Sequence, residues 1–272
     1  MSDSNQGSFT GSFPEYYDRY LVPMQFAPYA RILADRAKAL SPSRVLETAA
    51  GTGIVTQELV RMLPAGVTIT ATDLNQPMID HARTKPGLVQ VDWRQSDAMN
   101  LPFPDQTFDL IVCQFGVMFF SDKRIAFRNA SRVLRPGGHF LFGVWDDYQV
   151  MSNAPIAIAA GVVGPMLGRE PLSLLSPPYH DEDTIRADLA ATGFGMVQVE
   201  RISQPARAAS AREAAVITVQ GSMIRTAIEA ACPGRLKEAT DAVERALSAR
   251  FGSGAVEGTT NTLIVTAENP LA

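Results

Sequence analysis

Residues 45–59 read VLETAAGTGIVTQEL and place an apolar run, one acidic residue and two close glycines in front of a helical pattern. The segment RVLETA predicts a short buried strand. The apolar positions after Gly53 recur at the spacing of one helix face: Ile54, Leu59, Val60 and Leu63. A strand, a glycine turn and a helix in this order are typical of a nucleotide-binding turn, of a phosphate cradle or of an ordinary connection.

The glycine pair completes neither of the two common phosphate-binding signatures. Thr56 stands where the dinucleotide fingerprint G-x-G-x-x-G has its third glycine. The P-loop spacing G-x-x-x-x-G-K-[ST] is absent, which excludes that phosphate cradle. Gly51 and Gly53 therefore indicate either a ligand that passes close to the backbone or simply a tight turn.

The remaining chain predicts strands that alternate with helices. We expect strands at 44–49, 67–73, 88–97, 108–120 and 139–146, with helices at 15–40 (interrupted near Pro23 and Pro28), 54–63, 76–85 and 122–138. The continuous apolar run FDLIVCQFGVMFF is typical of a parallel strand covered on both faces. This alternation predicts an α/β fold with a doubly wound, Rossmann-like sheet that binds its ligand at the carboxyl ends of the strands.

The second half of the chain is less regular. We expect a helix with loops in residues 147–180, a helix at 181–194, a strand at 196–203, two helices in residues 210–250 and a last strand at 259–269. Residues 147–180 and 210–250 are apolar, so they predict either a cap over a small, partly apolar substrate or a dimer interface. The polar first dozen residues predict a segment that is ordered only with ligand, if at all.

Composition argues against several classes of partner. The chain has 272 residues, of which 46% are hydrophobic, and a formal net charge of −4 with no basic stretch. We therefore expect one large domain and no nucleic-acid partner. No secretory signal or membrane-length apolar run is present, and Cys113 and Cys232 belong to no CxxC motif. These features favour a cytoplasmic protein with neither a membrane partner nor a metal site.

Three acidic residues follow expected strands and are candidates for ligand binding. Asp73 lies 20 residues after Gly53, where it can accept hydrogen bonds from ribose hydroxyls or cap the next helix. Asp97, after the third strand, can meet the exocyclic amine of an adenine or remain a solvated loop acid. Glu47, at the end of the first strand, can receive a ligand ammonium or brace the turn.

With these residues in order, the sequence resembles the class I S-adenosylmethionine-dependent methyltransferases. It looks most like the small-molecule group related to the ubiquinone- and menaquinone-biosynthesis enzymes. The motifs that carry the resemblance are VLETAAGTG, ATDLNQPMI, SDAMNLPFPDQTFD, FDLIVCQFGVMFF and VLRPGGHFLFGVWD, within residues 15–146. The resemblance implies methyl transfer from S-adenosylmethionine to a small-molecule acceptor. It also implies a seven-stranded sheet in which the last strand lies antiparallel between the fifth and the sixth.

The resemblance also implies roles for particular residues. Glu47 and the backbone of Ala49, Gly51 and Gly53 would face the methionine end of the cofactor. The remaining implied contacts are Asp73 on the ribose, Leu74 and Met78 on the adenine faces, Asp97 and Ala98 on its polar edge, and Gln114 and Phe115 near the sulfonium. The family often has Asp at the position of Glu47 and Gly at that of Ala49, which leaves the contact of Glu47 open.

The N-terminal segment and the catalytic residues are the least determined parts of the expected site. Residues 1–40 would form a helical segment that covers the cofactor, followed by the methyltransferase domain in residues 41–272. Tyr17, Tyr20 and Met24 would line the site or pack on the core. The sequence shows no clear general base; His180, in SPPYHDED, is a weak candidate, and a solvated loop histidine is the favoured interpretation. Cys113 is expected in the core.

Alternatives remain at this point. An NAD-dependent oxidoreductase on the same architecture would usually have an all-parallel sheet, and a non-catalytic cofactor-binding protein would need no general base. The number of subunits also stays open, with a homodimer as one possibility.

Overall fold

The fold is taken from a computed structural model that describes residues 13–252 and 254–271. The expectation for the first dozen residues lies outside this range. Seven strands form one sheet: β1 (Arg44–Glu47), β2 (Thr68–Asp73), β3 (Asp92–Gln95), β4 (Phe108–Gln114), β5 (Leu134–Trp145), β6 (Gly195–Ala208) and β7 (Val256–Glu268). Their order is β3-β2-β1-β4-β5-β7-β6.

The direction of the last strand confirms the expected topology. β1 to β5 are mutually parallel, whereas β7 lies between β5 and β6 and runs antiparallel to both. Leu263, Ile264 and Val265 are all buried in β7, as a strand in the middle of a sheet requires. This order is not the all-parallel sheet of the oxidoreductase alternative.

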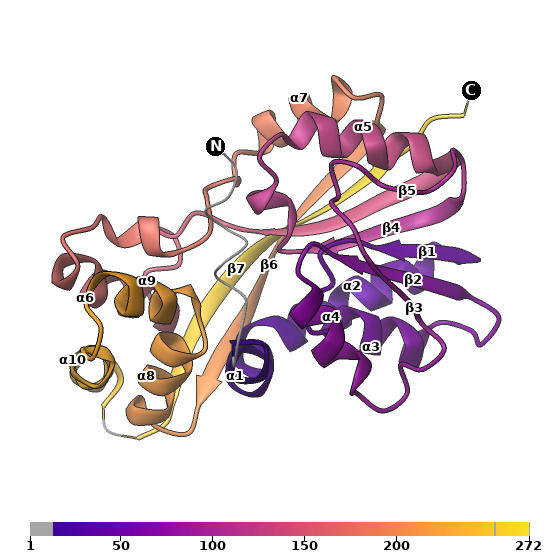
Figure 1. The fold of residues 1–272 in the computed structure, drawn as a ribbon. Helices are drawn as coiled ribbons and strands as arrows, with labels where there is room; N and C mark the ends of the chain where they lie inside the picture. Colours follow the sequence, from indigo (N-terminus) through magenta and orange to yellow (C-terminus); the bar gives the residue numbers. More distant parts are fainter. Residues whose placement is uncertain (1–12, 253, 272) are drawn as a thin grey trace.

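Helices cover both faces of the sheet (Figure 1). One face carries α5 (Lys123–Val133) and α7 (Glu182–Ala190), and the other carries α2 (Ala27–Ala39), α3 (Ile54–Met62) and α4 (Gln76–Arg83). The apolar run in β4 is buried on both sides, with Leu110, Ile111, Val112 and Cys113 fully shielded from solvent. Cys113 therefore belongs to the core, as expected.

Residues 13–39 are helical throughout. α1 (Phe13–Tyr16) continues into η2, a π-helix (Tyr17–Phe26), and then into α2. The expected breaks at Pro23 and Pro28 are wrong. Pro28 lies in the first turn of α2, where its missing N–H is not needed, and Pro23 is accommodated in the π-helix. We call residues 13–26 the strap.

Several further boundaries differ from expectation. The expected strand at 108–120 ends at Gln114, because the chain turns into the short helix η3 (Val117–Phe119), and β3 covers only Asp92–Gln95 of the expected 88–97. β5 begins at Leu134 instead of residue 139, because Leu134 already pairs with Phe108 before a register shift in the ladder. Residues 210–250 hold three helices instead of two: α8 (Ala211–Gln220), α9 (Met223–Ala231) and α10 (Leu236–Phe251). The Ser222 hydroxyl accepts the N–H of Ile224 and starts α9, a capping signal hidden within the helical pattern.

A helical cluster lies beyond the carboxyl end of the parallel strands. α6 (Pro155–Met166) and α8 pack against α10 around the extended β6–β7 pair (Figure 1). The short helices η3 (Val117–Phe119) and η4 (Pro171–Leu174) complete the described elements. Within the described part of the chain, no helix is both long and apolar enough to cross a membrane.

Candidate functional site

The turn between β1 and α3 is held in an unusual backbone shape. Ala49, Gly51 and Gly53 all have positive φ angles, of 53°, 56° and 84°. The N–H groups of Thr48 and Ala50 donate to backbone oxygens of β4 and β2 at 2.9 Å, which ties the turn to both neighbouring strands. The turn therefore lies where the carboxyl ends of three parallel strands meet.

The two glycines serve different purposes. A Cβ on Gly53 would come within 3.0 Å of the Trp93 ring, so this glycine permits close packing of the turn. A Cβ on Gly51 would meet nothing within 4 Å, so the space beside Gly51 is open. Gly51 lines the pocket described below, and Gly53 does not.

Asp73 ends β2 and supports the turn directly. Its carboxylate accepts the N–H of Gly51 and the N–H of Asn75, each at 2.8 Å. Burial raises the pKa of Asp73, although these backbone hydrogen bonds oppose that effect. Asn75, not Asp73, is the N-cap residue of α4.

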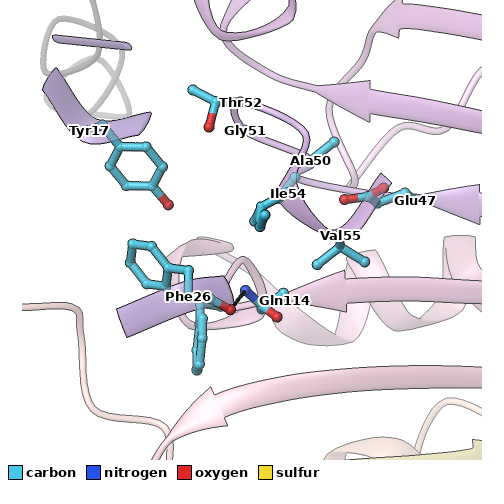
Figure 2. Close-up of a pocket in the computed structure, with 11 residues that line it drawn as sticks. Tyr17, Phe26, Glu47, Ala50, Gly51, Thr52, Ile54, Val55 and Gln114 are labelled. Atoms are coloured by element: carbon cyan, nitrogen blue, oxygen red, sulfur yellow. Dashed lines mark hydrogen bonds between the residues drawn. The ribbon is translucent and has the colours of Figure 1, made fainter. Parts of the chain in front are cut away.

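A pocket opens in front of the turn (Figure 2). It is lined by the strap, the turn, the start of α3 and the end of β4: Tyr17, Phe26, Glu47, Ala49, Ala50, Gly51, Thr52, Ile54, Val55, Gln114 and Phe115. The structure thus brings together Tyr17, Glu47, Ala49, Gly51, Gln114 and Phe115 from the expected set. Sequence reasoning missed the side chains of Phe26, Ile54 and Val55.

Glu47 is the buried acid of this pocket. It is 1% exposed, and its carboxyl accepts a hydrogen bond from the Thr56 hydroxyl at 2.6 Å. Burial raises the pKa of Glu47 to about 8; the Thr56 hydrogen bond opposes this shift and the negative charge of Asp73 adds to it. Glu47 is therefore largely protonated at neutral pH in the protein alone.

The strap is tied across the pocket at both ends. Near its start, Asp18 accepts a hydrogen bond from Thr52 at 2.7 Å and pairs with Lys85 and His81 of the α4 region. Burial alone would raise the pKa of Asp18, but the hydrogen bonds from Lys85, Thr52 and His81 lower it overall. At the other end, the Gln114 side-chain amide donates to the backbone oxygen of Phe26 at 3.2 Å.

Tyr17 extends from the strap toward the glycine turn (Figure 2). Burial and the negative charges of Asp73 and Asp18 raise the pKa of Tyr17, so its phenol stays protonated. A protonated phenol can donate a hydrogen bond to a ligand in the pocket but cannot serve as a base.

Phe115 occupies a strained backbone position at the end of β4. Its φ is 54°, which is uncommon for a bulky residue. The ring stacks on Trp145 with centroids 3.7 Å apart and planes 12° from parallel. Strain of this kind concentrates at functional sites.

The other expected contacts lie outside the pocket. Leu74 is 41% exposed and Met78 is buried beside it in α4. Asp97 and Ala98 follow β3, where the Asp97 carboxylate accepts the N–H of Met99 at 2.8 Å. These four residues follow β2 and β3, strands that are adjacent to each other in the sheet.

The remaining candidates are separated from the pocket. Met24 is buried in the core and Tyr20 stacks on Tyr16. His180 lies between η4 and α7, and no residue of 147–180 or 210–250 lines the pocket. Among residues 13–252 and 254–271, no three His, Cys, Asp or Glu side chains gather as a metal site would require.

Comparison with known proteins finds a family that is similar to part of this chain. Residues 46–142, from β1 through most of β5, match the family model described as a methyltransferase domain. Over these residues the chain is therefore similar to a methyltransferase domain. This match spans the glycine turn, Asp73, Asp97 and the end of β4.

Two methyltransferases are similar to part of this chain. A demethylmenaquinone methyltransferase of Deinococcus radiodurans is 40% identical over 115 residues, which are 42% of this chain and 47% of that protein. The ubiquinone/menaquinone biosynthesis C-methyltransferase UbiE of Cronobacter sakazakii is 36% identical over 117 residues, with the same coverage. The chain thus spans about half the length of these relatives.

The fold is shared over a longer stretch. The crystal structure of the YcgJ protein from Bacillus subtilis covers 90% of this chain and 100% of its own, with a TM-score of 0.60 and 17% sequence identity. At this identity the likeness supports the fold alone.

Proposed function

We propose that the protein transfers a methyl group from S-adenosylmethionine to a small-molecule acceptor. The observation that carries the proposal is the open space beside Gly51, next to Asp73, within a methyltransferase domain. A backbone without a side chain admits a ligand closely, and an acidic group at the end of β2 suits ribose hydroxyls. The last strand's antiparallel direction supports this function over an NAD-dependent oxidoreductase.

The cofactor would lie along the carboxyl edge of the sheet. Its methionine end would occupy the pocket between Glu47 and the backbone of Ala49 to Gly53. Asp73 would receive the ribose hydroxyls: its Oδ2 accepts the Gly51 N–H and keeps a lone pair, whereas its Oδ1 accepts both the backbone N–H and the side-chain amide of Asn75, and a ribose hydroxyl would replace that side-chain contact. The adenine would rest between Leu74 and Met78, with Asp97 and Ala98 at its polar edge.

The strap and the helical cluster would complete the site. Tyr17 already lines the pocket, and Met24 would approach only if the strap moved. Residues 147–180 and 210–250 would form a cap on the acceptor side, with a homodimer interface as the alternative. We place the reaction in the cytoplasm, in keeping with the sequence.

In-line displacement needs little acid–base chemistry from the protein. The sulfonium already activates its methyl group, so the protein mainly holds the nucleophile at attack distance. Such positioning can offset about 7–11 kcal/mol of barrier. His180 is not needed for this step, and it does not line the pocket.

Titration calorimetry tests the cofactor. We expect S-adenosylmethionine and S-adenosylhomocysteine to bind more tightly than NADH, with one site per chain. Tighter binding of NADH would contradict the proposal. Cofactor binding without formation of S-adenosylhomocysteine from any acceptor would favour a non-catalytic protein.

A further inference from the structure

The strap lies between two parts of the molecule. Its first helix, α1, stands between the helical cluster and α4, and it contacts α4 directly (Figure 1). On the other side, the corner between α8 and α9 packs on the strap. A Cβ on Gly221, at this corner, would lie 3.4 Å from the Cβ of Tyr20 and 3.6 Å from that of Leu21. The strap therefore contacts both the helical cluster and the helix that follows β2.

Three consecutive side chains of the strap make contacts in three directions. Tyr16 meets Arg225 of α9, whose guanidinium carbon lies 4.9 Å from the centre of the Tyr16 ring. Tyr17 lines the pocket, and Asp18 accepts the hydrogen bond from Thr52 in the glycine turn. Successive side chains of a helix project about 100° apart, so the orientation of Tyr16 fixes how Tyr17 faces the pocket.

Arg225 is held in place for its contact with Tyr16. Its Nε atom donates to the carboxylate of Glu229, one turn later in α9, at 2.8 Å, and its side chain is only 23% exposed. A guanidinium that has lost much of its hydration is attracted more strongly to an aromatic face than a solvated one. The Tyr16 ring is also supported, because it stacks on Tyr20 with centroids 5.8 Å apart. The contact thus joins an oriented cation to a ring that is fixed from its other neighbour.

We propose that Arg225 is a positioning residue of the cofactor site, which holds Tyr17 in the pocket through Tyr16 and so couples the helical cluster to cofactor binding. This inference rests on the proposed binding of S-adenosylmethionine. Coupling between two sites is reciprocal, so a ligand that fixes Tyr17 also stabilises α9, to which the strap is tied. A contact that only attached the strap to the surface would stabilise the fold without responding to the ligand.

The contacts of Asp18 are the competing explanation. They tie the same turn of the strap to the glycine turn and to the α4 region. If these contacts alone set the orientation of Tyr17, the loss of Arg225 would leave cofactor affinity unchanged. Variants of the Tyr16–Arg225 pair therefore distinguish the two explanations, because they leave Asp18 and its partners in place.

Matched variants isolate the contact. Arg225→Met keeps an unbranched side chain and removes the cation, whereas Arg225→Lys keeps a cation that can lie on the ring. Tyr16→Leu removes the aromatic face and Tyr16→Phe keeps it. The control is Arg212→Met on α8, because the ion pairs of Arg212 with Asp241 and Glu244 lead to α10 and not to the strap.

Calorimetric titration with S-adenosylhomocysteine measures the first consequence. We expect Arg225→Met and Tyr16→Leu each to weaken affinity about three- to tenfold. The double variant should lose no more than the larger single loss, because either change already removes the whole contact. Arg225→Lys, Tyr16→Phe and Arg212→Met should bind within about twofold of wild type. Urea unfolding of each variant checks that it is folded.

Amide hydrogen exchange with and without saturating S-adenosylhomocysteine separates coupling from simple attachment. In wild type, the ligand should slow exchange both in the strap and in residues 223–231 of α9. In Arg225→Met, it should slow exchange in the strap alone.

Four results would overturn the inference while the proposed function stands. They are unchanged affinity in Arg225→Met, equal losses in Arg225→Met and Arg225→Lys, additive losses in the double variant, and an α9 response that is absent from wild type or survives in Arg225→Met. Wild-type protein that binds neither S-adenosylmethionine nor S-adenosylhomocysteine would overturn the proposed function, and this inference with it.

Discussion

At the scale of single residues, the site depends on a glycine with a positive φ angle and on two buried carboxyl groups. Gly51 has a positive φ and open space where a side chain would lie, and Asp73 holds its N–H. Glu47 is buried, and none of the described Lys, Arg or His side chains pairs with its carboxyl.

Gly51→Val should weaken the binding of S-adenosylhomocysteine at least about tenfold, because the new side chain would occupy ligand space. The left-handed backbone would also cost roughly 1–2 kcal/mol of stability. Gly87→Val is the control, since Gly87 has a φ of 82° and equally open space but lies outside the pocket. Calorimetry and urea unfolding of both variants check this prediction. Unchanged affinity in Gly51→Val would refute the placement of the ligand.

Asp73→Asn should lower the affinity for S-adenosylhomocysteine by at least about tenfold. The change removes the charge that strengthens hydrogen bonds from two ribose hydroxyls, each worth about 1.5–3 kcal/mol. Asp92→Asn, at the exposed start of the neighbouring β3, should bind as wild type does. If Asp73→Asn keeps full affinity in a calorimetric titration, Asp73 only braces the turn.

Glu47 should make stability depend on pH. Its pKa rises from 4.5 in the unfolded chain to about 8 in the fold, so the folded state keeps a proton that the unfolded state releases. The stability associated with protonated Glu47 is complete below pH 4.5 and is lost as pH rises toward 8, at about 1.4 kcal/mol per pH unit.

Glu47→Gln stays neutral and should escape this loss. Urea unfolding of both proteins between pH 5 and 9 measures the difference, which should grow in favour of Glu47→Gln up to about pH 8 and then level off. A difference that does not change with pH would mean that Glu47 keeps an ordinary pKa in the folded protein.

At the scale of elements, polar contacts at Asp18 and Phe26 hold the strap in place. Asp18 joins the π-helix to the glycine turn and to α4, and Gln114 holds its far end. Helical pattern and composition would not distinguish this segment from an ordinary surface helix. Only the structure shows that the strap crosses the pocket in front of the glycine turn.

Asp18→Ala should loosen the strap without unfolding the sheet. Loss of the Thr52, His81 and Lys85 contacts should increase amide hydrogen exchange in residues 16–26 by roughly tenfold, while β4 stays protected. Asp35→Ala, an exposed change on α2, is the control. Equal exchange in the strap of wild type and Asp18→Ala would show that apolar packing alone holds it.

At the scale of the whole molecule, the pocket joins parts that are distant in sequence. The strap, the β1 turn and the end of β4 each supply one wall, and the antiparallel β7 connects this unit to the helical cluster. Ligand binding should therefore stabilise the whole described fold and not one segment of it.

S-adenosylhomocysteine at about 100 times its Kd should add about 2.7 kcal/mol to the free energy of unfolding. For a chain of this size, the Tm should rise by roughly 5–10 °C. Differential scanning calorimetry with the ligand, and with NADH as the control, measures the shift. A rise with NADH alone would contradict the proposed cofactor.

Sequence by itself determined the alternation of strands and helices, the two-sided burial of β4 and the glycine turn. These features depend on short-range periodicity and on turn residues that lie close to one another, whereas the place of the last strand was implied by the family resemblance. Only the tertiary structure decided that Phe26, Ile54 and Val55 line the pocket, that Asp73 holds Gly51, and that Asp18 ties the strap. The same holds for the Gln114 Oε1 atom, which is buried and accepts no hydrogen bond from the described residues. Burial and pairing arise where segments distant in sequence meet, so they leave no local pattern in the sequence.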